Sequence, residues 1–109
     1  MKLTTAQKML FEAGLSPRHK GFHYLSAALC RAATAGAGAV RGAMAQDDGH
    51  INRCMRYAIR YAWDGNEGDI RSLFRNHSFP PTPLELIHAL LWKLDSEAGG
   101  EERFLRTGS

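Results

Sequence analysis

The sequence predicts an all-α protein, a bundle of five to six helices that contains a helix-turn-helix. Two observations favour this class. Apolar residues recur at spacings of three and four in the apolar segments, as on one face of a helix, and no segment alternates apolar and polar residues as a half-buried strand does. The 109 residues suit a single core. We expect the helical domain to span residues 1–98 and a polar C-terminal tail to span residues 99–109.

The N-terminal part of the chain predicts two helices joined by a short connection. The first is expected over residues 6–13, capped by the Thr4–Thr5 pair and ended by Gly14 in a left-handed conformation. Ser16–Pro17 then predicts a new helix start, with the serine as cap and the proline in the first helical position. Apolar residues at helical spacing continue this second helix: Phe22, Leu25, Ala28 and Leu29.

The clearest periodicity lies between Ile51 and Trp63. Tyr57 and three arginines fall on the side opposite the apolar positions, at about 100° per residue. A weaker, glycine-interrupted helix over residues 38–44 and a turn over residues 46–49 come before it, which is the order of a helix-turn-helix. The apolar positions are Ile51, Cys54, Met55, Ala58, Ile59, Ala62 and Trp63, and the arginines are Arg53, Arg56 and Arg60.

Two further helices are expected in the C-terminal part. A short one is expected over residues 68–74. Thr82–Glu85 has the sequence of a capping box, with Pro83 in the first helical position, and predicts the start of a last helix. That helix is expected to end near Gly99–Gly100 and to bury Ile87, Leu90, Leu91 and Leu94.

Composition and charge indicate an ordinary soluble domain. The formal net charge is +3 and the isoelectric point is near 9.1, which is compatible with nucleic-acid binding but too weak to indicate it alone. Cys30 and Cys54 form no paired motif and are expected to be small buried side chains. The sequence has neither a secretory signal nor an apolar run of membrane-spanning length. We therefore expect a cytoplasmic protein with no membrane partner.

Residues with catalytic or metal-binding chemistry are present, but their spacing matches no familiar site. The sequence has no nucleophile elbow and no phosphate-binding loop, and its scattered acidic residues fit helix caps and turns. His19 and His23 have the i, i+4 spacing that can chelate a metal, yet no third ligand is near them in the sequence. We expect no enzymatic activity, no cofactor, no bound metal and no small-molecule substrate.

The strongest functional signal is the row formed by Arg53, Arg56 and Arg60. On an arbitrary amphipathic helix such a row is usually a solvated face. Two facts favour nucleic-acid binding instead. Arginine makes bidentate contacts with guanine and with phosphate, and this helix follows a short helix and a turn, as a recognition helix does.

Four motifs occur in the order in which a known family has them, over roughly residues 9 to 94. They are Glu12–Pro17 followed by His19–Phe22, Tyr24–Leu25 and Ala28; Ile51, Arg53, Arg56, Ala58–Ile59 and Ala62–Trp63; Ser72–Phe74; and Pro81–Thr82 with Glu85–Ile87. In these motifs the chain resembles the C-terminal DNA-binding effector domain of the master sporulation response regulator of endospore-forming bacteria, the stage 0 sporulation protein A family.

The resemblance implies a six-helix bundle with a helix-turn-helix near its middle, and a sequence-specific transcription regulator that can bind DNA as a tandem pair. Arg53 and Arg56 match arginines of the family's recognition helix that face the major groove, and Lys20 matches the lysine of a Lys-Gly motif. The chain differs from the family in a shorter stretch between residues 28 and 40, and in Asp47–Asp48, where the family has hydroxyl residues. We also expect no receiver domain.

Two functional hypotheses follow. In the first, the chain is a sequence-specific DNA-binding regulator of transcription. Arg53 and Arg56 then contact base edges or phosphates, and Arg41, Arg60 and Lys20 contact the DNA backbone. Its partner is double-stranded DNA, on which a homodimer or a tandem assembly is compatible with the resemblance. In the second, the domain keeps the same fold but binds protein instead of DNA and modulates a related regulator.

Overall fold

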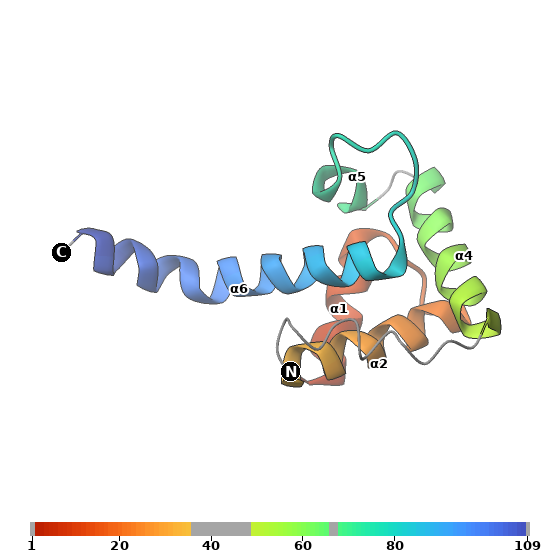
Figure 1. Ribbon diagram of the computed structural model, residues 1–109, viewed down its shortest axis with the longest axis horizontal. Coiled ribbons are helices and arrows are strands. Elements are labelled where there is room, and N and C mark those ends of the chain that lie inside the picture. The colour runs from red at the N-terminus through yellow and green to blue at the C-terminus, as the bar shows by residue number, and fades with distance from the viewer. Residues whose placement is uncertain (1, 36–48, 66–67, 109) are drawn as a thin grey trace.

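The computed structural model describes residues 2–35, 49–65 and 68–108, with side chains described as far as Ser96. Every regular element in these residues is a helix, and they contain no strand. The all-α class is therefore confirmed for the described part of the chain. The helices are α1 Leu3–Ala13, α2 Lys20–Ala35, α4 Gly49–Gly65, α5 Ile70–Leu73 and α6 Pro83–Gly108 (Figure 1).

The described residues contain one half of the predicted helix-turn-helix. The expected recognition helix is α4, which extends beyond the predicted Ile51–Trp63 at both ends. The expected first helix over residues 38–44, together with Arg41 and Asp47–Asp48, lies outside the described residues. The helix-turn-helix as a unit therefore stays a prediction.

Helix α2 is the centre of the arrangement, because it packs against α1, α4 and α6. Helix α6 begins beside α4 and then extends away from the other helices, so the C-terminus lies at the far end of the molecule (Figure 1). The expected end of this helix near Gly99–Gly100 is wrong, since α6 continues to Gly108. Two consecutive glycines lower helix propensity by about 1 kcal/mol each, but this cost alone does not end a helix.

The core lies where α1, α2, α4 and α6 meet. The inner face of α4 is buried at Met55, Ala58, Ile59, Ala62 and Trp63, as the periodicity predicts. The expected burial of both cysteines is wrong, because Cys30 and Cys54 are free thiols that are only half-buried at the edge of the core. The other large, fully buried apolar side chains are Leu10, Leu15, Leu25, Leu29, Ile70, Leu86, Ile87 and Leu90.

The ends of α1 show one correct and one wrong local prediction. Gly14 ends the helix in the left-handed conformation, with φ of 109°, and the Leu15 N–H donates to the carbonyl of Leu10 at 3.1 Å. The helix begins at Leu3, however, and its cap residue Lys2 makes no side-chain hydrogen bond. The Thr4–Thr5 pair lies inside the helix, so its predicted capping role is wrong.

Helix α2 begins later than the sequence predicts. The Ser16 side chain accepts a hydrogen bond from the Arg18 N–H at 3.3 Å, and its carbonyl accepts one from the His19 N–H at 3.1 Å. Both oxygens of Ser16 therefore close a turn before the helix, whose first residue is Lys20. The predicted helix start at Ser16–Pro17 is wrong for this reason.

The start of α6 is the predicted capping box. The Glu85 N–H donates to the Thr82 hydroxyl at 3.2 Å, and the Thr82 N–H donates to the Glu85 carboxylate at 2.9 Å. His77 lies 3.1 Å from the other oxygen of the same carboxylate. The Thr82 N–H first, and the His77 side chain second, hold the pKa of Glu85 below its ordinary value.

Candidate nucleic-acid interface

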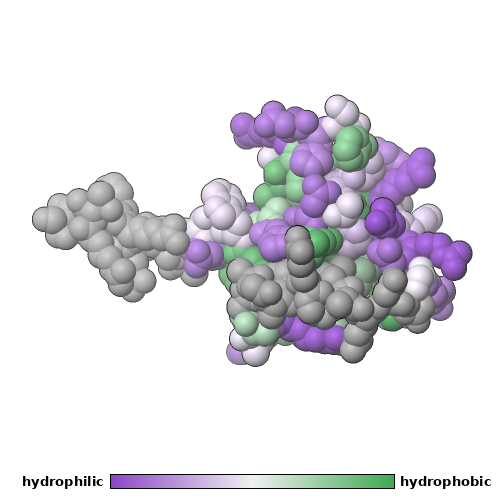
Figure 2. Space-filling model, viewed as in Figure 1, coloured by the Kyte–Doolittle hydropathy of each residue, from purple (hydrophilic) through white to green (hydrophobic). Residues whose placement is uncertain are grey.

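Helix α4 is strongly two-sided. Its arginines Arg53, Arg56 and Arg60 are exposed, on the side opposite the buried face, as the sequence predicts. Tyr57 and Tyr61 share this outer side, with 63% and 45% of their surface exposed. Hydrophilic residues predominate on the side of the molecule where α4 lies (Figure 2). Charged and aromatic side chains therefore form one continuous outer face.

An open groove of about 730 Å³ runs between α4 and the segment that leads into α2. Among the described residues, no carboxylate lines it. His19, His50 and Tyr57 also line it. We call this space the cationic groove, because it is lined by Arg18, Lys20, Arg53, Arg56 and Arg60.

The two walls of the cationic groove come from parts of the chain that are far apart in the sequence. Gly21 brings them together, since a Cβ at this position would collide with the carbonyl oxygen of Cys54 in α4. Lys20 is the first residue of α2, and Arg18 lies in the turn closed by Ser16. One wall of the groove therefore comes from the α1–α2 connection, and the other is the arginine face of α4.

The α4 arginines have weak partners within the described residues. The Arg60 Nε lies 3.6 Å from an oxygen of Asp64, and both side chains are exposed, so water screens this ion pair. The Arg53 Nε donates to the Gly49 carbonyl at 3.4 Å, which is long for a hydrogen bond. Arg56 has no hydrogen bond or ion pair with any described residue. These guanidinium groups are therefore accessible to an anionic ligand.

His19 contacts the two exposed tyrosines of α4. Its ring lies edge-on to the rings of Tyr57 and Tyr61, with centroid distances of 5.1 and 4.7 Å. Its Nδ1 is buried without a hydrogen-bond partner among the described residues. His23, by contrast, is exposed and lies 2.8 Å from the Pro17 carbonyl through its Nε2. The two histidines therefore make separate contacts, and the described residues hold no group of three metal-ligating side chains.

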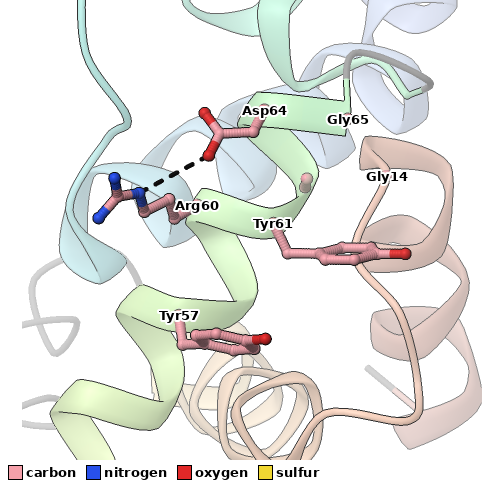
Figure 3. A pocket seen from close by; sticks show the side chains of 7 residues that line it. Gly14, Tyr57, Arg60, Tyr61, Asp64 and Gly65 are labelled. Atoms are coloured by element: carbon pink, nitrogen blue, oxygen red, sulfur yellow. Dashed lines mark ion pairs between the residues drawn. The ribbon is translucent and has the colours of Figure 1, made fainter.

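A second hollow, of about 510 Å³, lies beside the cationic groove, toward the end of α4. Tyr57 and Tyr61 project from α4 toward the segment that follows Gly14, whereas Arg60 and Asp64 project to the other side of the helix (Figure 3). Tyr57 and Arg60 line both spaces. We call the second space the aromatic pocket.

The structure brings together most of the residues that the sequence singles out. Lys20, Arg53, Arg56 and Arg60 line one groove, and Arg41 lies outside the described residues. Sequence reasoning missed Arg18, although its place beside the Lys-Gly motif was a signal that could have found it.

Comparison with known proteins identifies no relative. No family model, no curated protein and no solved structure matches the chain. Within the part of the chain that the structure describes, no helix combines the length and the apolar character that crossing a membrane requires.

Proposed function

We propose that the chain binds double-stranded DNA as a sequence-specific regulator of transcription, with α4 as the recognition helix. The observation that carries this proposal is the cationic groove, where five arginine and lysine side chains meet and no carboxylate of the described residues lines the walls. DNA presents one phosphate charge per about 1.7 Å of duplex, and neutralising these phosphates releases counterions. The proposal involves no catalysis, cofactor or metal, and it places the protein in the cytoplasm.

The arrangement suits a duplex. A helix with its side chains is about 10–12 Å wide, which matches the roughly 12 Å width of the major groove. Arg53 and Arg56 lie on the exposed face of α4, where they contact base edges or phosphates. Lys20 and Arg60 flank them and contact the DNA backbone, as Arg41 does in this proposal. Two copies on neighbouring half-sites would extend the interface along the duplex.

The test is fluorescence anisotropy with labelled genomic duplexes at several salt concentrations. Wild type is expected to bind with an affinity that falls steeply as salt rises. Arg53→Ala or Arg56→Ala should weaken binding by about 1–3 kcal/mol where the arginine contacts a base, and should relax specificity at that base. Arg31→Ala is the matched control, because Arg31 is an exposed arginine of α2 that does not line the groove. Absence of salt-dependent binding to any duplex would contradict the proposal.

A second candidate function is a protein-interaction module that modulates a related regulator. The observation that favours it is Trp92 of α6, which is 70% exposed on a helix that extends away from the other helices (Figure 1). Exposed tryptophan is enriched at binding hot spots between proteins. The DNA titration separates the two functions, since an interaction module keeps its fold but shows no salt-dependent binding to DNA.

A further inference from the structure

The cationic groove and the aromatic pocket are neighbours along α4. Tyr57 and Arg60 line both spaces, so the two spaces share a border on the outer face of the helix. Arg53 and Tyr57 lie one turn apart on the helix, about 6 Å along its axis. Positive charge therefore lies beside a flat aromatic surface, at a separation of one helical turn.

The two tyrosine rings of the aromatic pocket are partly exposed. His19 supports both tyrosine rings edge-on, yet 63% of Tyr57 and 45% of Tyr61 remain exposed. Gly14 and Gly65 also line the pocket and place no side chain over the rings. Asp64 also lines the pocket, but it pairs with Arg60 and projects to the side of α4 away from the tyrosines (Figure 3). The two tyrosine rings therefore present an accessible π surface.

One class of ligand combines a negative charge with a flat aromatic group, and so matches both the arginines and the tyrosines of this surface. A nucleotide joins an anionic phosphate to a flat base, and proteins that bind unpaired strands combine a positively charged groove with aromatic side chains on which bases stack. Inside a duplex, neighbouring base pairs cover both faces of each base. A base can reach the aromatic pocket only when it is unstacked.

We propose that this combined surface binds a nucleotide whose base is not held in a duplex. The base stacks on Tyr57 and Tyr61, and the attached phosphates lie among Arg18, Lys20 and Arg53. The inference rests on the proposed function for its phosphate-binding groove, and extends it by adding a subsite for a base. An unpaired strand and a free nucleotide share this chemistry, and the experiment distinguishes these two sources.

The experiment uses 2-aminopurine, a base analogue whose fluorescence falls when it stacks on an aromatic ring. The full chain is titrated into three probes: a single-stranded oligonucleotide with one central 2-aminopurine, the free 2-aminopurine nucleoside triphosphate, and a duplex in which the analogue is paired. Anisotropy of end-labelled copies of the strand and the duplex gives their affinities. We expect saturable quenching with the single strand and none with the duplex.

Three variants assign the signal to the aromatic pocket. Tyr57→Leu keeps an apolar side chain but removes the π face, and is expected to weaken single-strand binding about 5- to 100-fold and to abolish the quenching. Tyr57→Phe retains the ring and should behave as wild type. Phe79→Leu is the matched control, because Phe79 is 65% exposed and lines neither space. Duplex affinity is expected to change less than twofold in Phe79→Leu, whose side chain lines neither space.

The outcomes separate this inference from the proposed function. If only the single-stranded probe is quenched, the inference is supported and the ligand is an unpaired strand. If the free nucleoside triphosphate binds with equal affinity, the inference is also supported, and a single nucleotide is enough for binding. A single-strand affinity that is unchanged in Tyr57→Leu, or no quenching with either unpaired probe, overturns it. Duplex binding that persists in that case leaves the proposed function intact. Tyr57-dependent single-strand binding without any duplex binding supports the inference and contradicts the proposed function.

Discussion

Gly21 in the first turn of α2 lies directly against the backbone of α4 at Cys54. A Cβ at Gly21 would collide with the carbonyl group of Cys54 and would lie 2.9 Å from the Cα of Met55. These are backbone atoms, which cannot rotate out of the way as the end of a side chain can. The contact therefore fixes the distance between Lys20 at the start of α2 and the arginine face of α4.

Gly21→Ala is expected to destabilise the protein, although alanine favours helices more than glycine does. The added methyl group forces α2 and α4 apart, and overpacking of this kind costs about 1–3 kcal/mol. Gly65→Ala is the matched control, because a Cβ at Gly65 meets no atom of the described residues within 4 Å, and it should be neutral or slightly stabilising. Thermal unfolding followed by circular dichroism measures both. A Gly21→Ala variant as stable as wild type would show that the two helices are not in close contact.

Ile59→Asp is expected to unfold the domain. Ile59 is fully buried on the inner face of α4, and an aspartate there would place an unpaired charge in the core, at a cost of more than about 4 kcal/mol. Arg56→Asp is the control, since Arg56 is exposed on the same helix and its replacement removes no core contact. The free energy of unfolding in urea should fall far more for Ile59→Asp than for Arg56→Asp. Equal stability of the two variants would refute the assignment of the inner face.

The parts of the fold that local sequence controls were predictable. The inner face of α4 follows from its periodicity, the end of α1 from Gly14, and the start of α6 from the capping box of Thr82 and Glu85. The start of α2 was misjudged because Ser16 can cap a helix or close a turn, and the sequence does not distinguish these uses.

The candidate site was predictable only on one of its walls. The arginine face of α4 is a property of a single helix, and periodicity is enough to find it. The opposite wall, with Arg18 and His19, depends on the contact between Gly21 and Cys54, which lie more than thirty residues apart in the chain. Helical spacing carries no information about such a tertiary contact, so the grouping of His19 with the tyrosines of α4 appears only in the structure.

Glu85 is expected to make the stability of the domain depend on acid pH. The Thr82 N–H and His77 lower the pKa of Glu85, so its carboxylate stabilises the folded state above the pKa of an unfolded glutamate, and this contribution is lost as the pH falls through the lowered value. Glu85→Gln keeps an oxygen acceptor for the Thr82 N–H but does not titrate. Wild type should therefore exceed Glu85→Gln in stability at neutral pH, and the difference should shrink in acid. A difference that is constant between neutral and strongly acidic pH would show that the carboxylate charge is unimportant.

Thr82→Ala tests the other half of the capping box. Removing the hydroxyl leaves the Glu85 N–H without its acceptor, and loss of such a cap costs about 0.5–2 kcal/mol. Thr82→Ser retains the hydroxyl and should stay close to wild type in urea unfolding. If the serine and alanine variants were equally destabilised, the loss would come from the threonine methyl group and not from the hydrogen bond.

Arg18→Ala is expected to weaken duplex binding evenly across DNA sequences. Arg18 lies on the turn before α2, on the wall of the cationic groove opposite the outer face of α4. In the proposed complex we therefore expect it to meet a phosphate and not a base edge. Loss of one phosphate contact should reduce the slope of log affinity against log salt by about one. Arg31→Ala, at an exposed position of α2 away from the groove, should leave both affinity and slope unchanged. The measurement is anisotropy at four or more salt concentrations with two unrelated duplexes, and thermal melting checks that each variant folds as wild type does. If Arg18→Ala weakened binding to one duplex only, Arg18 would contact bases. If the slope of log affinity against log salt were unchanged on both duplexes, the α1–α2 wall of the groove would not reach the DNA.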